Sequence, residues 1–585
     1  MKASIVRRQL IDDSHLPQHL HPVVKQIYAR RGVKSADELV LSAQQLIPPS
    51  QLFGADQACD VLLDALAQQN KIIIVGDFDA DGATSTALMM EALRLLGFRN
   101  HQFLVPNRFD YGYGLSPEIV EVAAQQGAEL IITVDNGISC IAGVSRAKAL
   151  GIKVIVTDHH LPGQTLPDAD AIVNPNQGEC TFASKALAGV GVAFYLMLAL
   201  RQRLRQMNWF EQSGVAEPNL AQLLDLVALG TVADVVTLDA NNRILVAQGL
   251  KRIQAGQTRP GIQALIEVAK RNQDRLSASD FGFALGPRIN AAGRLDDISY
   301  GINCLLEPNI MAARAMAQEL DQLNRARREI EQGMQVEAEQ ILSRLNLAAA
   351  NDDSIEIPKA IALFHPEWHQ GVIGIVAGRI KEKFHRPCIV FAVASDEQPL
   401  TDDSEIKGSA RSIVGLHIRD LLEQVDSRYP DLISKFGGHA MAAGLTIKKA
   451  NFKRFEQAFS EVANEWLNDD QLQGKIYSDG SLSSRELTLD FAELLRASGP
   501  WGQHFEEPVF DDIFTVVQQR LVGEKHLKLV VQKDGLTLDA IAFNIDLKAW
   551  PNHSAEIIRL AYKLDVNEFR GKHNLQLMVE HIELA

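Results

Sequence analysis

The sequence predicts an α/β protein of several domains, whose first large domain is built on a doubly wound parallel sheet. Two observations support this class. Between residues 72 and 236, apolar runs rich in β-branched residues alternate with helix-like stretches, which is the pattern of a parallel sheet covered by helices on both faces. The chain also has 585 residues, a length that predicts roughly three to four compact units.

Four apolar segments that end in acid or imidazole are expected to be strands of this sheet. They are IIIVGDFDADG at 72–82, LIITVDNG at 130–137, VIVTDHH at 154–160 and ALGTVADVV at 228–236. Intervening stretches at 83–96, 116–126 and 141–150 predict helices. Because ligand-binding groups gather at the carboxyl ends of parallel strands, we expect the polar ends of all four segments to meet.

The pattern along the chain predicts five segments. A stretch at 311–345 with almost no Gly or Pro carries apolar residues at spacings of three and four, which indicates one long amphipathic helix. After residue 510, short alternating runs favour a barrel of OB type, although a generic sandwich fits nearly as well. The expected segments are an N-terminal extension at 1–49, a catalytic domain at 50–305, a long connecting helix at 306–350, a second α/β domain at 351–469 and an OB-like domain at 470–585.

Composition limits the class of protein. Five cysteines without paired spacing fit a reducing cytosol better than a zinc site or a disulfide framework. The start of the chain lacks the apolar core of a secretory signal, and the longest apolar run, at 186–200, is shorter than the roughly 20 residues of a spanning helix. We therefore expect a cytoplasmic protein with no membrane contact. A net charge of −15 argues against a nucleic-acid binder when taken alone, but basic residues can still concentrate on one wall of a cleft.

The gathered acids and imidazoles predict a dinuclear metal site. Carboxylates so close together repel one another unless cations lie between them. Oxygen ligands suit Mg²⁺ and Mn²⁺, and added imidazole shifts the preference toward Mn²⁺. In GDFDADG the acids at alternate positions would share one face of an extended strand. The expected participants are Asp77, Asp79, Asp81, Asp135, Asp158, His159, His160 and Asp234.

Each motif also has an ordinary structural explanation. D-x-D-x-D-G resembles the start of an EF-hand calcium loop, but no Glu follows at the required position. A DHH triplet alone can be a surface turn, and a single Asp at a strand end, such as Asp135 or Asp234, is often a helix cap. The combination favours metal binding. A dinuclear centre can generate metal-bound hydroxide and clamp both oxygens of a phosphoryl displacement, so phosphoester hydrolysis is the predicted chemistry.

The ordered motifs GDFDADG, TVDNG, TDHH, TVADVV and GPRINAAGR resemble the DHH phosphoesterase superfamily over nearly the whole chain. Within it, the chain is most similar to the bacterial single-strand-specific DNA exonucleases. The resemblance implies a DHH domain, a DHHA1 domain carrying WHQGVIGIVAGRI and FGGHAMAAG, and a terminal OB-like domain. It also implies that two ions, Mn²⁺ or Mg²⁺, are held by Asp79, Asp81, Asp135, His159 and Asp234.

The resemblance further implies catalytic support from Asp77 and Asp158, and contact between His160 and the scissile phosphate. In PNRFDYGYGLS, Arg108 is suited to holding phosphate and Tyr113 to stacking on a base, unless this segment is a Gly-rich turn with core tyrosines.

Other substrate contacts are expected along the chain. The family pattern implies that Arg108 grips the terminal 5′ phosphate together with Ser409 and Arg411 of KGSARS, although Ala410 stands where Gly is common. Further candidates are Arg288, Arg294, His369 and His439, and Arg325, Arg327 and Arg328 on the long helix. A buried structural role fits the two histidines equally well, and a solvated face fits the helix trio.

The implied function is a metal-dependent exonuclease that hydrolyses single-stranded DNA from 5′ to 3′ into mononucleotides during recombination and DNA repair. Expected partners are single-stranded DNA with a 5′ end, a single-strand-binding protein and a helicase, and the expected state is a monomer. Composition and spacing alone support only a dinuclear phosphoesterase. One rival is a relative that cleaves short RNA or cyclic dinucleotides, against which the OB-like segment argues. The other is a silent single-strand clamp, whose expected broken acidic motifs are absent.

Overall fold

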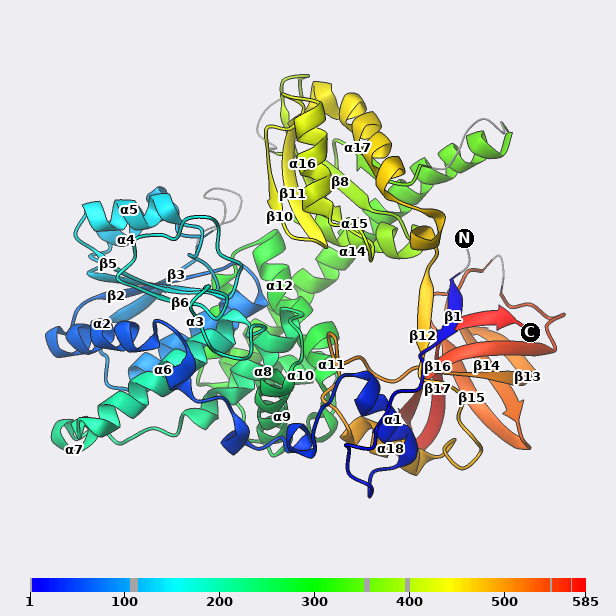
Figure 1. The fold of residues 1–585 in the computed structure, drawn as a ribbon, viewed down its shortest axis with the longest axis horizontal. Helices are drawn as coiled ribbons and strands as arrows, with labels where there is room; N and C mark the ends of the chain where they lie inside the picture. The colour runs from blue at the N-terminus through cyan, green and yellow to red at the C-terminus, as the bar shows by residue number, and fades with distance from the viewer. Residues whose placement is uncertain (1–2, 106–113, 352–357, 395–399, 548–549, 570) are drawn as a thin grey trace. The chain divides into compact units, whose positions relative to one another are not determined.

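The computed structural model describes residues 3–105, 114–351, 358–394, 400–547, 550–569 and 571–585. The chain forms two compact units, whose elements are labelled in Figure 1. The larger unit comprises Arg8–Asn324 and Asp479–Ala585, and the smaller comprises Met1–Arg7 and Arg325–Ser478.

A five-stranded sheet in the order β3-β2-β4-β5-β6 organises the first part of the larger unit. All neighbouring strands run parallel. The carboxyl ends of β2, β4 and β5 therefore lie side by side at one edge of the sheet. The strands are β2 (Ile72–Gly76), β3 (His101–Leu104), β4 (Leu130–Val134), β5 (Lys153–Thr157) and β6 (Ala171–Val173).

Helices cover both faces of this sheet (Figure 1). Alternate residues of β2 enter two separate cores, since Ile73 and Val75 pack with α4 and α5, whereas Ile72 and Ile74 pack with α2, α3 and α6. This arrangement confirms the predicted doubly wound class. The covering helices are α2 (Ala55–Gln68), α3 (Ala80–Leu95), α4 (Pro117–Gln125), α5 (Ile141–Ala149) and α6 (Gly189–Gln206).

The fourth predicted strand is wrong. The segment ALGTVADVV belongs to helix α8 (Leu224–Ala233), and Asp234 is the residue that ends it. This helix is buried on all sides over residues 224–231 and packs against α3, α6 and α9 (Ala240–Gln254). A helix buried all round has no polar stripe, so a short apolar run of this kind cannot be distinguished from a buried strand by its periodicity.

Further helices complete the helical part of the larger unit. Between α11 and α12 the chain makes a π-helical turn at Phe281–Leu285. The long helix predicted at 311–345 is α14, which extends over Ile310–Asn351; its residues up to Asn324 belong to the larger unit and those from Arg325 to the smaller. The remaining helices are α1 (Pro22–Arg30), α7 (Trp209–Ser213), α10 (Pro260–Val268), α11 (Ala278–Asp280), α12 (Gly286–Leu295) and α13 (Ser299–Leu306).

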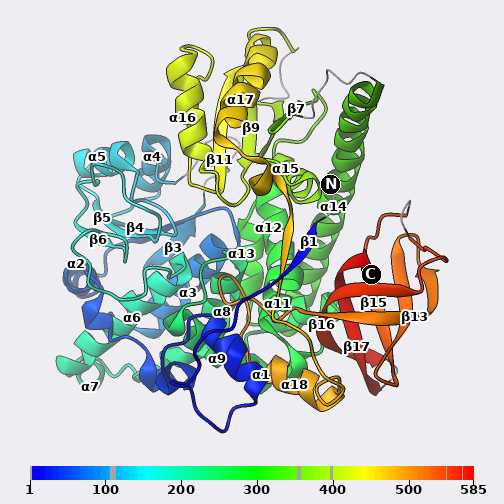
Figure 2. The ribbon, with the colours of Figure 1, turned by 45° about the vertical axis from the view of Figure 1, so that its right-hand side comes forward.

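The C-terminal part of the larger unit is a closed barrel in the order β13-β14-β15-β17-β16. Figure 2 labels its strands β13, β15, β16 and β17. In β14, alternate residues Leu527, Leu529 and Val531 point inward and fill the barrel. Helix α18 (Leu489–Ala497) packs against β16 and β17. The barrel prediction is confirmed, and the alternative of a sandwich is wrong. The strands are β13 (Phe510–Val522), β14 (His526–Lys533), β15 (Leu536–Ala542), β16 (Ile557–Phe569) and β17 (Lys572–Leu584).

The smaller unit is a second α/β fold with the strand order β10-β11-β9-β8-β7. Its sheet is mixed, because β7 and β8 run parallel while the other neighbours run antiparallel. The short strands β1 (Ser4–Arg7) and β12 (Lys475–Ser478) pair with each other in parallel. The other elements are β7 (Ile361–Phe364), α15 (Ile373–Phe384), β8 (Cys388–Val393), β9 (Glu405–Arg411), α16 (Ile418–Arg428), β10 (Lys435–Gly438), β11 (Ala442–Lys448) and α17 (Phe452–Trp466).

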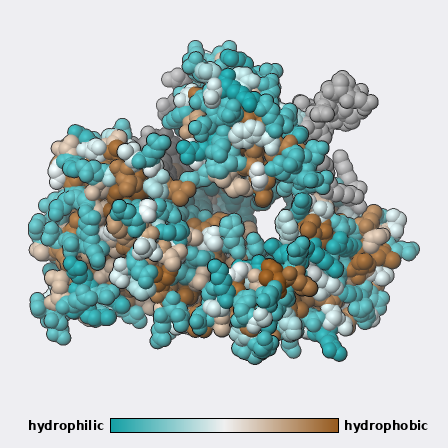
Figure 3. Space-filling view, in the orientation of Figure 1, coloured by the Kyte–Doolittle hydropathy of each residue, from teal (hydrophilic) through white to brown (hydrophobic). Residues whose placement is uncertain are grey.

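One face of the molecule is shown in space-filling form in Figure 3. In Figure 3 the visible face is mostly polar, with hydrophobic residues scattered among polar ones. Within the described part of the chain, none of the helices combines the length and the apolar character that crossing a bilayer requires.

Candidate metal centre

The candidate site lies at the carboxyl edge of the parallel sheet. Its residues follow β2, β4 and β5 and end helix α8. In each of three groups, one ligand atom per residue lies within 4.8 Å of the others. The groups are Asp77, Asp79 and Asp135; Asp81, His159 and Asp234; and Asp135, His159 and His160.

His159 lies between two carboxylates that come from distant parts of the chain. Its Nε2 is 3.1 Å from Asp135 Oδ1, which follows β4, and 3.5 Å from Asp234 Oδ2, at the end of α8. An imidazole flanked by two carboxylate oxygens is a donor set suited to divalent transition metals and Mn²⁺. The helical position of Asp234 therefore still delivers its carboxylate to the predicted cluster.

The electrostatics of this pocket require positive charge. Burial and the neighbouring Asp79 raise the pKa of Asp81 to about 7. Burial and the surrounding acids likewise raise the pKa values of Asp135 and Asp234 well above the ordinary range of a carboxyl group. Divalent cations would reverse this repulsion, and carboxylate oxygens are the ligands that they prefer. The side chains in the pocket thus fit a metal centre.

The acidic loop differs locally from its predicted geometry. Asp77, Asp79 and Asp81 do not share one face of a strand, because β2 ends at Gly76 and α3 begins at Ala80. Asp79 is the N-cap of α3, and its Oδ1 accepts hydrogen bonds from the backbone N–H groups of Asp81 at 2.9 Å and Gly82 at 3.0 Å. A capping Asp starts a helix readily, so α3 begins three residues earlier than predicted.

Asp81 is held at the N-terminus of another helix. Its two carboxylate oxygens accept hydrogen bonds from Gly189 N at 2.6 Å and Val190 N at 3.0 Å, in the first turn of α6. The positive end of a helix dipole stabilises an acid in this position. The chain therefore orients Asp81 through its backbone contacts with α6.

Asp158 orients the two histidines that follow it. Its Oδ1 accepts from the backbone N–H groups of His159 and His160 and lies 2.7 Å from His160 Nδ1, while Oδ2 accepts from Ile138 N at 2.9 Å. Burial alone would raise the pKa of Asp158, but the hydrogen bonds from His160 outweigh it and the pKa is lowered. Burial likewise disfavours the charged form of His160, yet its bond to Asp158 raises the pKa.

Several positioning residues were missed by the sequence analysis. Asn290 Oδ1 accepts a hydrogen bond from Ala80 N at 2.7 Å and so fixes the start of α3. Asn174 and Asn176 donate to the backbone carbonyls of His160 and His159 at 2.9 and 2.6 Å. The arginines of the segment GPRINAAGR were predicted to contact substrate. Its Asn290, which was not singled out, is the residue that contacts the acidic loop.

Two glycines allow helices to approach the acids closely. A Cβ at Gly189 would lie 2.6 Å from Asp135 Cβ, and one at Gly230 would lie 2.9 Å from Asp81 Oδ1. Neither position has room for a side chain. The sequence gives no sign that these glycines are required, because each one approaches an acid that is distant in the chain.

The predicted arginines of the larger unit have different positions. The guanidinium of Arg288 is buried, donates to Ala284 O at 2.6 Å and pairs with Asp321 at 2.7 Å on α14, so it holds α12 against α14. Arg294 is half-buried in the last turn of α12. Arg108 and Tyr113 lie outside the described residues.

In the smaller unit, Ser409 and Arg411 lie together on β9. Arg411 Nη1 donates to Ser409 Oγ at 3.1 Å. A Cβ at Gly374, in the first turn of α15, would lie 2.9 Å from both Ser409 Oγ and Arg411 Nη2. The structure therefore gathers a hydroxyl, a guanidinium and a helix N-terminus at one place.

The remaining substrate-binding candidates of the smaller unit differ in their exposure to solvent. His439 is exposed and His369 is half-buried, so neither is a fully buried structural histidine. On α14, Arg327 is buried in an ion pair with Glu331 at 2.6 Å, whereas Arg325 and Arg328 are exposed. The helix trio is thus not a single basic face.

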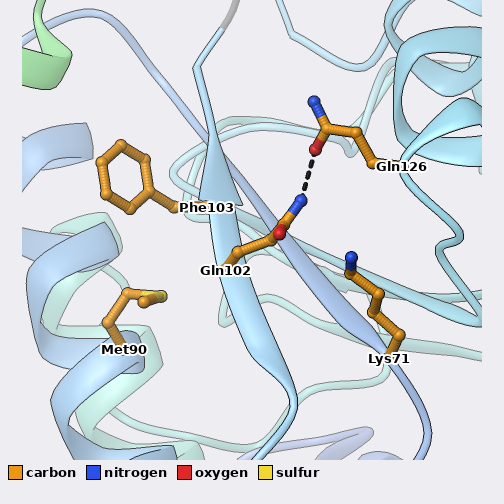
Figure 4. Close-up of a pocket in the computed structure, with 5 residues that line it drawn as sticks. All are labelled: Lys71, Met90, Gln102, Phe103 and Gln126. Atoms are coloured by element: carbon orange, nitrogen blue, oxygen red, sulfur yellow. Dashed lines mark hydrogen bonds between the residues drawn. The ribbon is translucent and has the colours of Figure 1, made fainter.

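A separate hollow of about 550 Å³ lies along the edge strand β3 of the parallel sheet (Figure 4). Phe103 and Met90 lie on one side of the strand, and Gln102, Gln126 and Lys71 on the other. Lys71 immediately precedes β2, so this hollow reaches the amino end of the sheet. It contains none of the clustered acids and is distinct from the metal centre.

Comparison with known proteins identifies the family. Three family models match the chain: "DHH family, N-terminal domain" at residues 71–231, "DHHA1 domain" at 357–469 and "RecJ OB domain" at 478–581. The chain is also 57% identical to the single-stranded-DNA-specific exonucleases RecJ of Salmonella typhimurium and Escherichia coli, over 98% of each chain. The chain belongs to the RecJ family. This confirms the resemblance drawn from the motifs.

A solved RecJ structure shares the fold. The crystal structure of RecJ from Thermus thermophilus in complex with Mn²⁺ has a TM-score of 0.77 and 29% sequence identity, and the match covers 96% of this chain and 76% of that chain. A second structure of the same RecJ contains Mg²⁺. RecJ of Thermus thermophilus thus binds both Mn²⁺ and Mg²⁺, which are the two kinds of ion that the acidic motifs predict.

Proposed function

We propose that this RecJ-family chain is a metal-dependent exonuclease that hydrolyses single-stranded DNA from the 5′ end and releases mononucleotides. The observation that carries the proposal is the convergence of acids and imidazole at the carboxyl edge of the sheet. The similar RecJ proteins are named single-stranded-DNA-specific exonucleases, and RecJ of Thermus thermophilus was crystallised with Mn²⁺ or Mg²⁺.

Two divalent ions fit the donor groups of the pocket. When bound, such a pair activates water and stabilises the charge that develops on a phosphodiester in displacement. The proposed ligands are Asp79, Asp81, Asp135, His159 and Asp234. Asp77, within reach of Asp79 and Asp135, adds negative charge that strengthens cation binding.

His160 is the proposed contact to the scissile phosphate. Its Nδ1 is bound to the buried Asp158, which fixes the ring and leaves Nε2 as the nitrogen that can serve a substrate. A third of its side chain remains exposed, at 34%, so a phosphate can reach it. In that position the ring orients the phosphate and donates a proton to the leaving oxygen.

We also propose that Ser409 and Arg411, with Arg108, bind the 5′ phosphate. A planar guanidinium beside a hydroxyl suits phosphate recognition, and Gly374 lets the first turn of α15 approach both groups closely. His439 is proposed as a further substrate contact, since its side chain is exposed. Arg288, Arg294 and Tyr113 are proposed as substrate contacts from the family resemblance, and Arg288 also forms an ion pair with Asp321.

The cellular setting is part of the same proposal. An enzyme that needs unpaired strands depends on other proteins that open duplexes and hold single strands, so a helicase and a single-strand-binding protein are the proposed partners. We propose that the chain acts as a cytoplasmic monomer in recombination and DNA repair.

The test is digestion of end-labelled substrates with Mn²⁺ or EDTA. Single-stranded DNA, duplex DNA and short RNA are each offered with a 5′ phosphate or a 5′ hydroxyl. The proposal predicts early release of a 5′-labelled mononucleotide from single-stranded DNA only, its loss in EDTA, and faster release from the phosphorylated strand. Preference for short RNA would favour the small-substrate rival, and binding without cleavage would favour the silent clamp.

A further inference from the structure

Two exposed apolar side chains lie on the segments that meet at the end of α8, where the metal-ligand candidate Asp234 is found. Val235 follows it directly and is 62% exposed, and Phe283 in the π-helical turn is 79% exposed. Single exposed hydrophobic residues are common on protein surfaces. Two further observations distinguish these residues: they lie close to Asp234 in the sequence or the fold, and their backbone conformations are unusual.

The π-helical turn packs directly against the end of α8. A Cβ at Gly282 would lie 3.7 Å from Val232 Cγ1, and one at Gly286 would lie 3.1 Å from Ala233 Cβ. Phe283 lies between these two contact points in the sequence, and Asp234 immediately follows Ala233, so the segment that carries the exposed ring packs against the end of α8 that bears Asp234. Turns of π type inside helical segments occur frequently at functional sites.

The backbone of Val235 is strained. Its φ is 63°, in the left-handed region that β-branched residues rarely adopt. An exposed Val gains little from packing, whereas Asn would adopt this conformation at lower cost. The chain holds the strain by anchoring the next residues, because Leu238 N donates to Gln503 O at 2.9 Å and Thr237 Oγ1 lies 2.7 Å from His504 Nδ1. Strain that persists beside a candidate active site points to function.

We propose that Phe283 and Val235 form an apolar platform that receives a base next to the scissile phosphodiester. The carboxylates and imidazoles of the pocket suit cations and phosphate, but they offer no flat apolar surface to a base. An aromatic ring does, and stacking on it tolerates every base because each has a π face. This inference rests on the proposed nuclease function and adds to it the residues that position the nucleotide.

The test compares normal and abasic strands with the Mn²⁺-loaded full chain. Both strands carry a 5′ phosphate, and one has tetrahydrofuran residues at its first two positions. Phe283→Ala should raise KM for the normal strand roughly tenfold, as expected for one lost stacking contact, with little change in kcat. It should leave KM for the abasic strand unchanged, and Phe283→Trp should retain the wild-type KM for both.

Met207→Ala is the matched control. Met207 is also an exposed apolar residue, at 51%, but it ends α6, whose first turn contacts Asp81. A helix of 18 residues spans about 27 Å at 1.5 Å per residue, so this control lies far from the metal centre. It should leave KM unchanged for both strands.

A second variant separates substrate binding from folding. Val235→Asn removes the apolar surface and relieves the backbone strain, so it should raise KM for the normal strand while the Tm stays level or rises. Equal losses on normal and abasic strands, or an unchanged KM in Phe283→Ala or Val235→Asn, would overturn the platform. Failure of the wild-type chain to cleave either strand would overturn the nuclease function and the platform together.

Discussion

The metal centre and the C-terminal barrel both bury carboxylates, but the barrel pairs its acid with a lysine, whereas the acids around Asp135 mainly face one another. In the barrel, Asp512 pairs with Lys533 and accepts a hydrogen bond from Tyr562 Oη at 2.6 Å. In the metal centre, the charged groups that most affect Asp135 are four other carboxylates of the same pocket. A buried charge is tolerated when opposite charge compensates it. The difference therefore identifies the barrel cluster as complete and the sheet-edge cluster as a site for external cations.

The largest expected effect is on catalysis. Asp81→Ala, Asp135→Asn and His159→Ala should each lower kcat by at least about a thousandfold, because each removes a donor to ions that stabilise the transition state. Binding of the strand should remain measurable by fluorescence anisotropy. Asp512→Asn is the matched control and should keep the kcat of the folded protein. Wild-type hydrolysis by any of the three variants would refute its assignment as a metal ligand.

Stability should respond in the opposite direction in the two clusters. Asp512→Ala removes the buried acceptor that Lys533, Tyr562 Oη and Leu482 N share and should cost about 3–5 kcal/mol of unfolding free energy. Asp135→Asn removes repulsion and should raise the Tm of the metal-free protein. Urea and thermal denaturation in EDTA measure both effects. A metal-free Asp135→Asn protein less stable than wild type would contradict the assigned difference between the clusters.

A smaller effect is expected at Asn290. Asn290→Ala removes the hydrogen bond to Ala80 N and loosens the loop that carries the acids. Loss of such a supporting contact typically weakens metal affinity by roughly 10- to 100-fold. Titration of Mn²⁺ followed by calorimetry measures the change, and Asn174→Ala, which affects the His160 segment, provides a comparison. An unchanged Mn²⁺ affinity in Asn290→Ala would contradict the role of Asn290 in positioning the acidic loop.

The smallest expected effect is the pH dependence of metal stabilisation. The pKa of Asp81 is raised from 3.8 to about 7 in the folded, metal-free protein, so the folded state binds more protons than the unfolded state between these values. Its stability therefore falls as pH rises from about 4 to 7. Metal binding requires the ionised carboxylates, so the increase in Tm on adding Mn²⁺ should be a few degrees larger at pH 8 than at pH 5. An increase that is independent of pH would contradict this linkage.

The convergence of the acids and imidazoles could be predicted because it depends on a local pattern. Asp135 and His159 follow buried apolar runs, and parallel strands bring their carboxyl ends together. The helical state of residues 224–233 could not be predicted, since α8 is buried all round and shows no period.

The supporting contacts could not be predicted because they join distant residues. Asn290 bonds to Ala80 across 210 positions, and Gly230 is required by its closeness to Asp81. Arg288 shows the same limit, because its motif predicted a substrate contact but gave no sign of the ion pair with Asp321. A sequence pattern identifies the donors of the site more readily than the residues that position them.

Counting bound ions tests the central claim most directly. Isothermal titration of the metal-free chain with Mn²⁺ should give two ions per wild-type chain and fewer in Asp135→Asn, with Asp512→Asn unchanged. A wild-type chain that binds no Mn²⁺, or that loses as much binding in Asp512→Asn as in Asp135→Asn, would contradict the account.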